Sequence, residues 1–417
     1  MLMQSDAVDQ NKPGERRSRK LWILIVVWGL AIIAAVPALC RWTAVPKSDG
    51  KLVQYLGYMV AAAICGYIYR RESRHLTRSR TFVLVFLVFL LTCIVNNLHS
   101  VYVDNGVPYL PRFVSNVLWQ GLVNDLVIQL SPAAIPHSYR FLPNSIVRWF
   151  QMGGLAYEPA RDLYRLIVGI LLFYAIYKFA RLYTNYLGAI IAMLFITVMY
   201  PVSFEYYAGQ LTDPLSHLSF VLAFIFLETE DFALLLTTLL VGSLAKETVL
   251  AMAGYYVLFR RQERNYLLKA ITLCVASTAI FLGVRMLVLH GSIHEYTQIS
   301  VAPPNMPSIN WQDARWPKGL LLTVGAFVPF LVLSWRETPR SLKQLALFLF
   351  PVLFLSGLFF SFLVEMRNFM PLVFVLAVIA GRYLSGSWSA QNDEGGFAGS
   401  PPEAAACAEP MIRVESP

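Results

Sequence analysis

Long blocks of apolar residues alternate along the chain with short polar segments that are rich in arginine and lysine. Most blocks approach the roughly 20 residues that a helix needs to cross a bilayer. Their lengths predict an all-α fold, a polytopic transmembrane bundle of about twelve helices. The predicted helices are Leu21–Cys40, Leu52–Tyr69, Thr81–Asn97, Leu163–Leu182, Tyr186–Phe204, Leu215–Leu227, Phe232–Leu244, Thr248–Leu258, Tyr266–Leu289, Gly319–Trp335, Leu345–Leu363 and Phe369–Tyr383.

The composition agrees with a membrane protein. Hydrophobic residues make up 57% of the chain and charged residues 14%, with a mean hydropathy of +0.55. A soluble domain has about 25% charged residues. The net charge of +9 would suggest nucleic acid in a soluble protein, but here the basic residues separate apolar blocks. We therefore expect membrane lipids, and no nucleic acid, among the partners.

The sequence shows no motif for a metal or a nucleotide. Its five cysteines include no C-x-x-C pair and no cluster with histidine. No P-loop is present, and no G-x-G-x-x-G follows a strand pattern. We expect no metal and no other cofactor.

Basic residues predict the orientation of the bundle. They crowd four connections that fall on the N-terminal side if the helices alternate, and that side is the cytoplasm by the positive-inside rule. The sequence predicts a multi-pass protein of the cell membrane, of the bacterial inner-membrane type, with both termini cytoplasmic. The basic residues are Arg70, Arg71, Arg74, Arg78, Arg80, Lys178, Arg181, Arg260, Arg261, Arg264, Arg336, Arg340 and Lys343.

Three regions follow from this topology. Residues 1–20 form a basic cytoplasmic N-terminus, and residues 21–384 form the transmembrane domain with a long outer loop over 98–162. Residues 385–417 are rich in Gly, Ser, Pro and Ala, which predicts a disordered cytoplasmic tail. The apolar run from Leu21 is too long for the core of a signal peptide, so we expect an uncleaved first helix.

The outer loop contains two segments with a helical pattern. In the first, one face carries Phe113, Val117, Leu118, Leu122 and Leu126 and the other carries Ser115, Asn116, Gln120, Asn124 and Asp125. This pattern predicts an amphipathic helix lying on the membrane. A second short helix is predicted over Asn144–Met152, ended by Gly153 and Gly154.

Lys246 and Glu247 stand side by side within a long apolar stretch. A charge near the centre of a membrane segment costs at least about 2.5 kcal/mol. We interpret the stretch as two short helices that meet at an outer turn, because short helices are tolerated at membrane depth where they line a polar cavity. The pair then lies at the same face as the other outer turns.

Charged and polar residues gather at those outer turns and in the outer loop. A polar cleft containing both acids and bases is therefore expected among the outer ends of the helices. The candidate site residues are Asp104, His137, Arg140, Tyr206, Gln210, Asp213, Lys246, Glu247, Glu365 and Arg367.

Each candidate also has a purely structural interpretation. Asp104 precedes Asn-Gly and could only form a turn. Asp213 precedes proline and could cap a helix. Lys246 could extend its head to the interface, and Arg140 and Arg367 could anchor headgroups. The position of all of them at one face favours a shared site.

The layout and five short motifs resemble the GT-C superfamily of integral-membrane glycosyltransferases. The motifs are "DNGVPY" at Asp104, "YRFLP" at Tyr139, "YAGQLTDPL" at Tyr207, "AKET" at Ala245 and "EMRNFMPL" at Glu365. The resemblance implies a sugar donor on a polyprenyl phosphate or diphosphate and transfer to a glycan, lipid or protein acceptor on the outer face. The acid of that family normally follows the first helix, whereas Asp104 follows the third predicted helix.

The resemblance implies a division of roles among the candidates. Asp104 would act as the catalytic base that takes the proton of the acceptor. Arg140, Lys246 and Arg367 would bind the leaving phosphate, because guanidinium and ammonium groups donate to phosphate oxygens. The hydroxyl groups of the sugar would be bound by Tyr206, Gln210 and Asp213.

Two other classes of function fit the same pattern. A polysaccharide polymerase or ligase shares the many helices, the large outer loop and arginines for lipid-linked phosphate. A secondary transporter or flippase uses charges at the midplane and paired broken helices. Charges gathered at one face favour transfer chemistry, and a polar path through the bundle would favour transport.

The predicted topology can be tested by labelling single cysteines in a cysteine-free background. We expect an impermeant thiol reagent to label Ser115→Cys on intact cells and to leave Arg74→Cys unlabelled until the cells are permeabilised. The opposite pattern would reverse the orientation.

Overall fold

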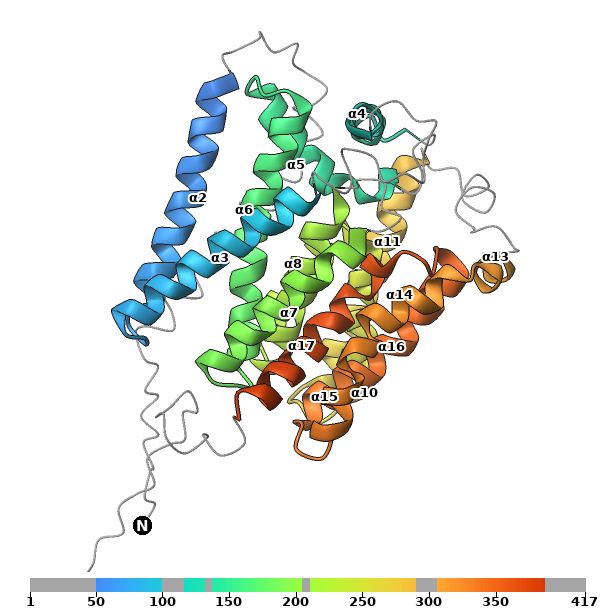
Figure 1. Cartoon of the computed structure of the whole chain (residues 1–417). Helices are drawn as coiled ribbons and strands as arrows, with labels where there is room; N and C mark the ends of the chain where they lie inside the picture. The colour runs from blue at the N-terminus through green and yellow to red at the C-terminus, as the bar shows by residue number, and fades with distance from the viewer. Residues whose placement is uncertain (1–49, 100–115, 132–136, 205–210, 290–305, 387–417) are drawn as a thin grey trace, which may run out of the picture.

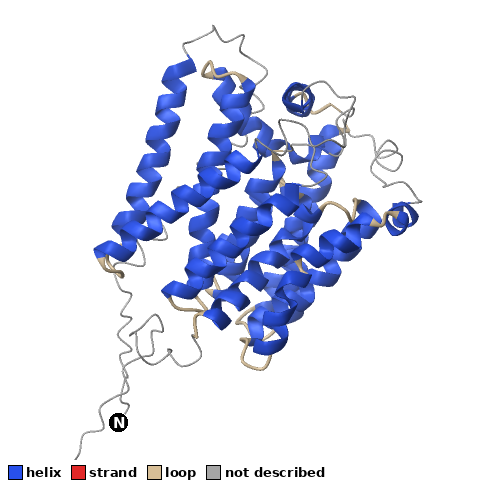
Figure 2. Cartoon of the chain, viewed as in Figure 1, coloured by secondary structure: helices blue, strands red, loops and turns tan. Residues whose placement is uncertain are grey.

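The structure is a computed structural model, and it describes residues 50–99, 116–131, 137–204, 211–289 and 306–386. All regular elements in these ranges are helices, and none of the described residues lies in a strand (Figure 2). The all-helical fold class is therefore confirmed.

Most of the helices run between two ends of a single bundle (Figure 1). The α-helices are joined at several points by short 3₁₀ segments, which are labelled η. In chain order the elements are α2 Gly50–Glu72, α3 Arg78–His99, α4 Asn116–Ile128, η3 His137–Arg140, α5 Phe141–Met152, α6 Tyr157–Arg181, α7 Tyr186–Phe204, α8 Thr212–Glu228, α9 Phe232–Ser243, η4 Glu247–Leu250, α10 Ala251–Phe259, α11 Tyr266–Val288, α13 Met306–Gln312, α14 Arg315–Thr323, η5 Gly325–Phe327, α15 Val328–Ser334, α16 Arg340–Phe360, η6 Met366–Phe369 and α17 Met370–Leu384.

Six helical stretches in the described ranges are long and apolar enough to cross a membrane. On α11, the side chains of Leu267, Leu268 and Val275 are 69%, 67% and 62% exposed, as lipid-facing residues are in a membrane. These features indicate insertion into a membrane. The six stretches are Arg78–Leu98, Tyr157–Arg181, Tyr266–Val288, Arg315–Ser334, Arg340–Phe360 and Met366–Leu384.

Every apolar segment predicted from Leu52 onward falls on a helix. Several of these helices are short, however: α9 has 12 residues and α10 has 9. A span of the bilayer needs about 20 residues, so the number of twelve spans stays a prediction. The first predicted helix, the basic N-terminus and all but the first two residues of the tail lie outside the described residues, and so do residues 100–115 and 132–136 of the outer loop.

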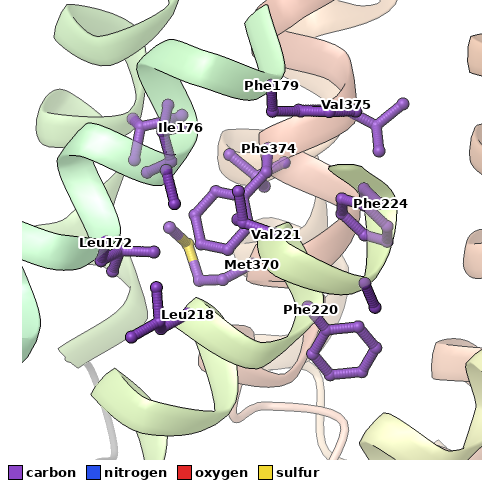
Figure 3. Close-up of a cluster of buried hydrophobic side chains, with 14 of the residues drawn as sticks. Leu172, Ile176, Phe179, Leu218, Phe220, Val221, Phe224, Met370, Phe374 and Val375 are labelled. Carbon is purple, nitrogen blue, oxygen red and sulfur yellow. The ribbon is translucent and has the colours of Figure 1, made fainter. Parts of the chain in front are cut away.

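Helix α17 forms the centre of the bundle. All of its residues from Met370 to Gly381 are buried, which is expected of a helix that is apolar on every side. Figure 3 shows Met370 and Phe374 of α17 among side chains of α6 and α8, including Ile176 and Val221. The interior of the bundle at this level is apolar.

Glycine allows the closest approach of two helices. A Cβ atom on Gly381 of α17 would lie 2.3 Å from the carbonyl oxygen of Gly188 on α7. Small residues let membrane helices pack backbone to backbone, because no side chain separates them. This contact holds α17 against α7.

The basic connections gather at one end of the bundle, which we call the basic end. Lys178 at the end of α6 lies 3.3 Å from Glu72 at the end of α2, and Arg260 after α10 pairs with Glu228 at the end of α8. Tyr183, after α6, contacts both Ser341 of α16 and Glu228. The four connections therefore share one end, as the alternating topology requires. Which side of the membrane this end faces stays a prediction.

Helix α4, the first helix of the predicted outer loop, turns two of its polar side chains toward the protein and not away from it. In α4, Gln120 and Asn124 are buried, whereas Leu122 is 58% exposed and Leu126 is 37% exposed. The polar side chains bond to the protein: Arg161 donates to Gln120 over 3.0 Å, and Asn144 donates to Asn124 over 3.1 Å. Leu122 and Leu126 are left outward together with Asp125, whereas Val123 and Val127 pack inward against an apolar cluster that includes Leu142.

The second loop helix is confirmed with a wider range than predicted. Helix α5 begins at Phe141, three residues before the predicted start, and ends at Met152. Gly153 follows as its C-cap, and Gly154 has a φ of 97°, a conformation that favours glycine.

The α7–α17 contact predicts a strong effect of one methyl group. We expect Gly381→Ala to lower stability by about 1–3 kcal/mol, because the new Cβ atom meets backbone that cannot move aside. Thermal unfolding of the purified protein in detergent measures this. Gly283→Ala on α11 is the control, since nothing lies within 4 Å of its Cβ position. Equal melting temperatures for the two variants would contradict the packing argument.

Candidate functional site

Asp213 lies between two basic side chains at the end of the bundle opposite the basic end. Lys246 donates to its Oδ1 over 3.2 Å, and Arg367 donates to its Oδ2 over 3.0 Å. All three side chains are at least 91% buried. Both carboxylate oxygens of Asp213 therefore serve to hold cations from two other parts of the chain.

Two further side chains close this contact into a ring, which we call the charge ring. Arg367 donates to Glu365 over 2.9 Å, and Asn368 donates to the same Glu365 oxygen over 3.4 Å. The side-chain amide oxygen of Asn368 accepts a hydrogen bond from Lys246 over 2.7 Å. The charge ring thus consists of Asp213, Arg367, Glu365, Asn368 and Lys246.

The ring residues stand where helices begin or are interrupted. Asp213 is in the first turn of α8, where a negative charge is favourable beside the unpaired N–H groups of the helix. Lys246 is in an extended conformation between α9 and η4, and Arg367 is in η6, just before α17. The break between α9 and η4 confirms that Lys246 and Glu247 lie at a turn between two short helices.

Glu247 turns away from the ring and pairs with Arg140. The guanidinium donates through Nε to one carboxylate oxygen over 2.9 Å and through Nη2 to the other over 2.7 Å. The side chains are 15% and 23% exposed, more than Asp213, Lys246 and Arg367. Next to this pair, the amide of Leu142 donates to the carbonyl of Leu244, so the outer loop is tied to the bundle at two points.

Two histidines lie near these charges. Burial, helped by the Arg140 guanidinium, lowers the pKa of His137 to about 4. His137 is therefore uncharged at pH 7 and adds no positive charge to the site. His217 lies 3.3 Å from the carbonyl oxygen of Arg367 and 3.4 Å from the hydroxyl of Tyr200.

Three buried arginines at this end were missed by the sequence reasoning. Arg161 and Arg165 stand four residues apart on one face of α6, and both are buried. Arg285 is in the last turn of α11, with its guanidinium 3.4 Å from the ring centre of Phe281 and 4.6 Å from that of Tyr139. The signal was available, because Arg165 and Arg285 lie inside predicted apolar spans, where a charge is costly.

Basic charge exceeds acidic charge at this end of the bundle. Of the described residues that are buried and charged here, one is acidic, Asp213, and five are basic: Arg161, Arg165, Lys246, Arg285 and Arg367. The half-buried Arg140, Glu247 and Glu365 raise the count to six basic and three acidic residues. We call this region the cationic end.

The sequence-predicted site residues fall into two groups. The structure brings His137, Arg140, Asp213, Lys246, Glu247, Glu365 and Arg367 together at the cationic end. The remaining three, Asp104, Tyr206 and Gln210, lie outside the described residues. Within the described ranges, no three His, Cys, Asp or Glu side chains are grouped closely enough to hold a metal ion.

The fold and the site define a helical membrane protein with a cationic end built from helix starts and interruptions. Comparisons with protein-family models, curated proteins and solved structures found no match.

The charge ring predicts a large effect of neutralising its central acid. Asp213→Asn leaves Lys246 and Arg367 buried without their shared counter-charge, and breaking a buried ion pair costs about 3–5 kcal/mol. Thermal unfolding in detergent checks this. The control is Asp125→Asn, because Asp125 is 56% exposed and lies 3.8 Å from the partly exposed Arg148. An exposed ion pair contributes about 1 kcal/mol or less to stability. A similar loss of stability in both variants would therefore contradict a stabilising role of the charge ring.

Proposed function

We propose that the protein is a glycosyltransferase that moves a sugar from a polyprenyl-phosphate carrier to an acceptor at the cationic end of the bundle. The observation that carries this proposal is the excess of basic over acidic side chains buried at that end. A group of buried cations that outnumbers the buried acids creates a positive potential, which attracts anions to this end of the bundle. A phosphate attached to a lipid reaches this position from the membrane itself.

The contacts at the site support a division of roles. Arg140 is the most exposed of the three predicted phosphate-binding groups, with 15% exposure of its side chain. Lys246 and Arg367 are held by Asp213, so the proposal makes Asp213 the residue that positions them and no longer a ligand of sugar hydroxyls. Tyr206 and Gln210 remain proposed for the hydroxyls, and Asp104 remains proposed as the base.

The distribution of charge also supports an outer-face reaction. The arginine-rich connections lie at the basic end, and the positive-inside rule places such connections in the cytoplasm. The cationic end then faces outward. A donor carried by a lipid supplies the activated sugar there, where no nucleotide sugar is needed.

The interior of the bundle favours transfer over transport. Between the two ends, Leu218, Val221 and Phe224 of α8 pack against Ile176 of α6 and Phe374 of α17 (Figure 3). A transporter or flippase needs polar groups near the midplane, whereas this described part of the core is apolar. A polymerase or ligase is distinguished by its product, which is a longer or transferred polysaccharide.

The proposed reaction is tested with purified protein in nanodiscs. Polyprenyl-phosphate sugars with a radioactive sugar are supplied together with membrane extracts as the source of acceptor. Transfer of single sugars to an extractable acceptor supports the proposal. Movement of the lipid-linked sugar across vesicles without transfer would reject it in favour of transport.

Two variants separate the proposed roles of base and phosphate ligand. Asp104→Asn keeps the shape but removes the proton acceptor, so turnover should fall by roughly 10²–10⁴ while donor binding changes little. Arg140→Ala should weaken donor binding, because it removes a charge-assisted contact. Turnover and donor affinity are measured on the same preparations. Near-normal turnover of Asp104→Asn would eliminate it as the base.

A further inference from the structure

The pairing of Arg140 with Glu247 has the geometry of a phosphate contact. Two parallel hydrogen bonds, of 2.9 and 2.7 Å, join the guanidinium fork to the two carboxylate oxygens. A phosphate group offers the same fork two oxygens in the same arrangement. The carboxylate of Glu247 therefore occupies the position on Arg140 that a phosphate would take.

The Arg140–Glu247 pair is separate from the charge ring. The ring closes through Asp213, Arg367, Glu365, Asn368 and Lys246, and Glu247 takes no part in it. The backbone bond between Leu142 and Leu244 also holds the two segments together without the side chains of the pair. The pair can therefore separate while the ring and the local backbone stay in place.

We propose that Glu247 is an internal competitor that occupies the Arg140 fork until a phosphate ligand displaces it. The inference rests on the proposed function only in taking the phosphate of the polyprenyl carrier as that ligand. Glu247 then determines specificity, because a ligand must bind the fork better than a carboxylate does. The polyprenyl phosphate that remains when the sugar leaves is a monoester, with up to two negative charges and three terminal oxygens, and it meets this requirement.

Arg285 makes the exchange less costly for Glu247. Its guanidinium is buried between Phe281 and Tyr139, and it interacts electrostatically with Glu247. When Arg140 turns to a phosphate, the Glu247 carboxylate keeps this second cation nearby. A released carboxylate with no cation would oppose the exchange, because an unpaired buried charge is strongly unfavourable.

The inference is tested by measuring the affinity for phosphate-bearing probes in nanodiscs of neutral lipid. The probes are a polyprenyl phosphate without sugar, phosphatidic acid and inorganic phosphate. If Glu247 occupies the fork in most molecules, Glu247→Gln should bind polyprenyl phosphate roughly tenfold more tightly, since apparent affinity is reduced by the fraction of blocked sites. Glu247→Asp, whose shorter side chain cannot reach the fork in the same way, should also bind more tightly while it keeps the negative charge.

Glu228→Gln is the matched control. Glu228 carries the same charge and also pairs with an arginine, but that arginine is Arg260 at the basic end and not Arg140. Removing it changes the net charge equally without emptying the Arg140 fork. Its affinity for polyprenyl phosphate should therefore change by less than about twofold. Combining Glu247→Gln with Arg140→Ala should abolish the gain.

The outcomes separate this inference from the proposed function. Wild-type affinity in both Glu247 variants, or an equal gain in Glu228→Gln, would overturn the competitor role while polyprenyl-phosphate binding still supports the glycosyltransferase. A tenfold gain in affinity for phosphatidic acid or inorganic phosphate, with none for polyprenyl phosphate, supports the competitor role. It rejects polyprenyl phosphate as the ligand. Failure of all probes to bind any variant would overturn both.

Discussion

The pairing of buried charges inside an apolar bundle is the constraint on which the rest of this structure depends. Asp213 can be buried only because Lys246 and Arg367 each contact one of its oxygens. These three residues come from α8, from the turn before η4 and from η6, so satisfying one carboxylate fixes three segments relative to one another. The interruptions of the helices at these positions follow from the same requirement.

The charge ring is connected directly to the packing of the core. Helix α17 begins three residues after Arg367, and its fully buried residues Met370–Gly381 run through the centre of the bundle. Any shift of α17 would therefore move Arg367 away from Asp213. The close backbone contact of Gly381 with Gly188 restricts such a shift from the other end of the helix. Apolar packing and ionic pairing thus support the same arrangement.

The membrane suits the way in which α4 packs. Leu122 and Leu126 are exposed, whereas Gln120 accepts from Arg161 of α6 and Asn124 accepts from Asn144 of α5. Lipid is an adequate solvent for leucine and a poor one for an amide. The outer loop is thereby attached to the bundle by polar contacts.

The sequence by itself determined the helical class, most of the segments that form helices from Leu52 onward, though not α13, and the gathering of basic connections at one end. Those features depend on local apolar length and on charge spacing, which are readable along the chain. Only the tertiary structure decided that Lys246 bonds to Asp213 whereas its neighbour Glu247 bonds to Arg140, 107 residues away. Spacing along the chain carries no information on contacts between distant helix ends. The burial of Arg161, Arg165 and Arg285 beside them was decided in the same way, because it depends on which helix faces pack together.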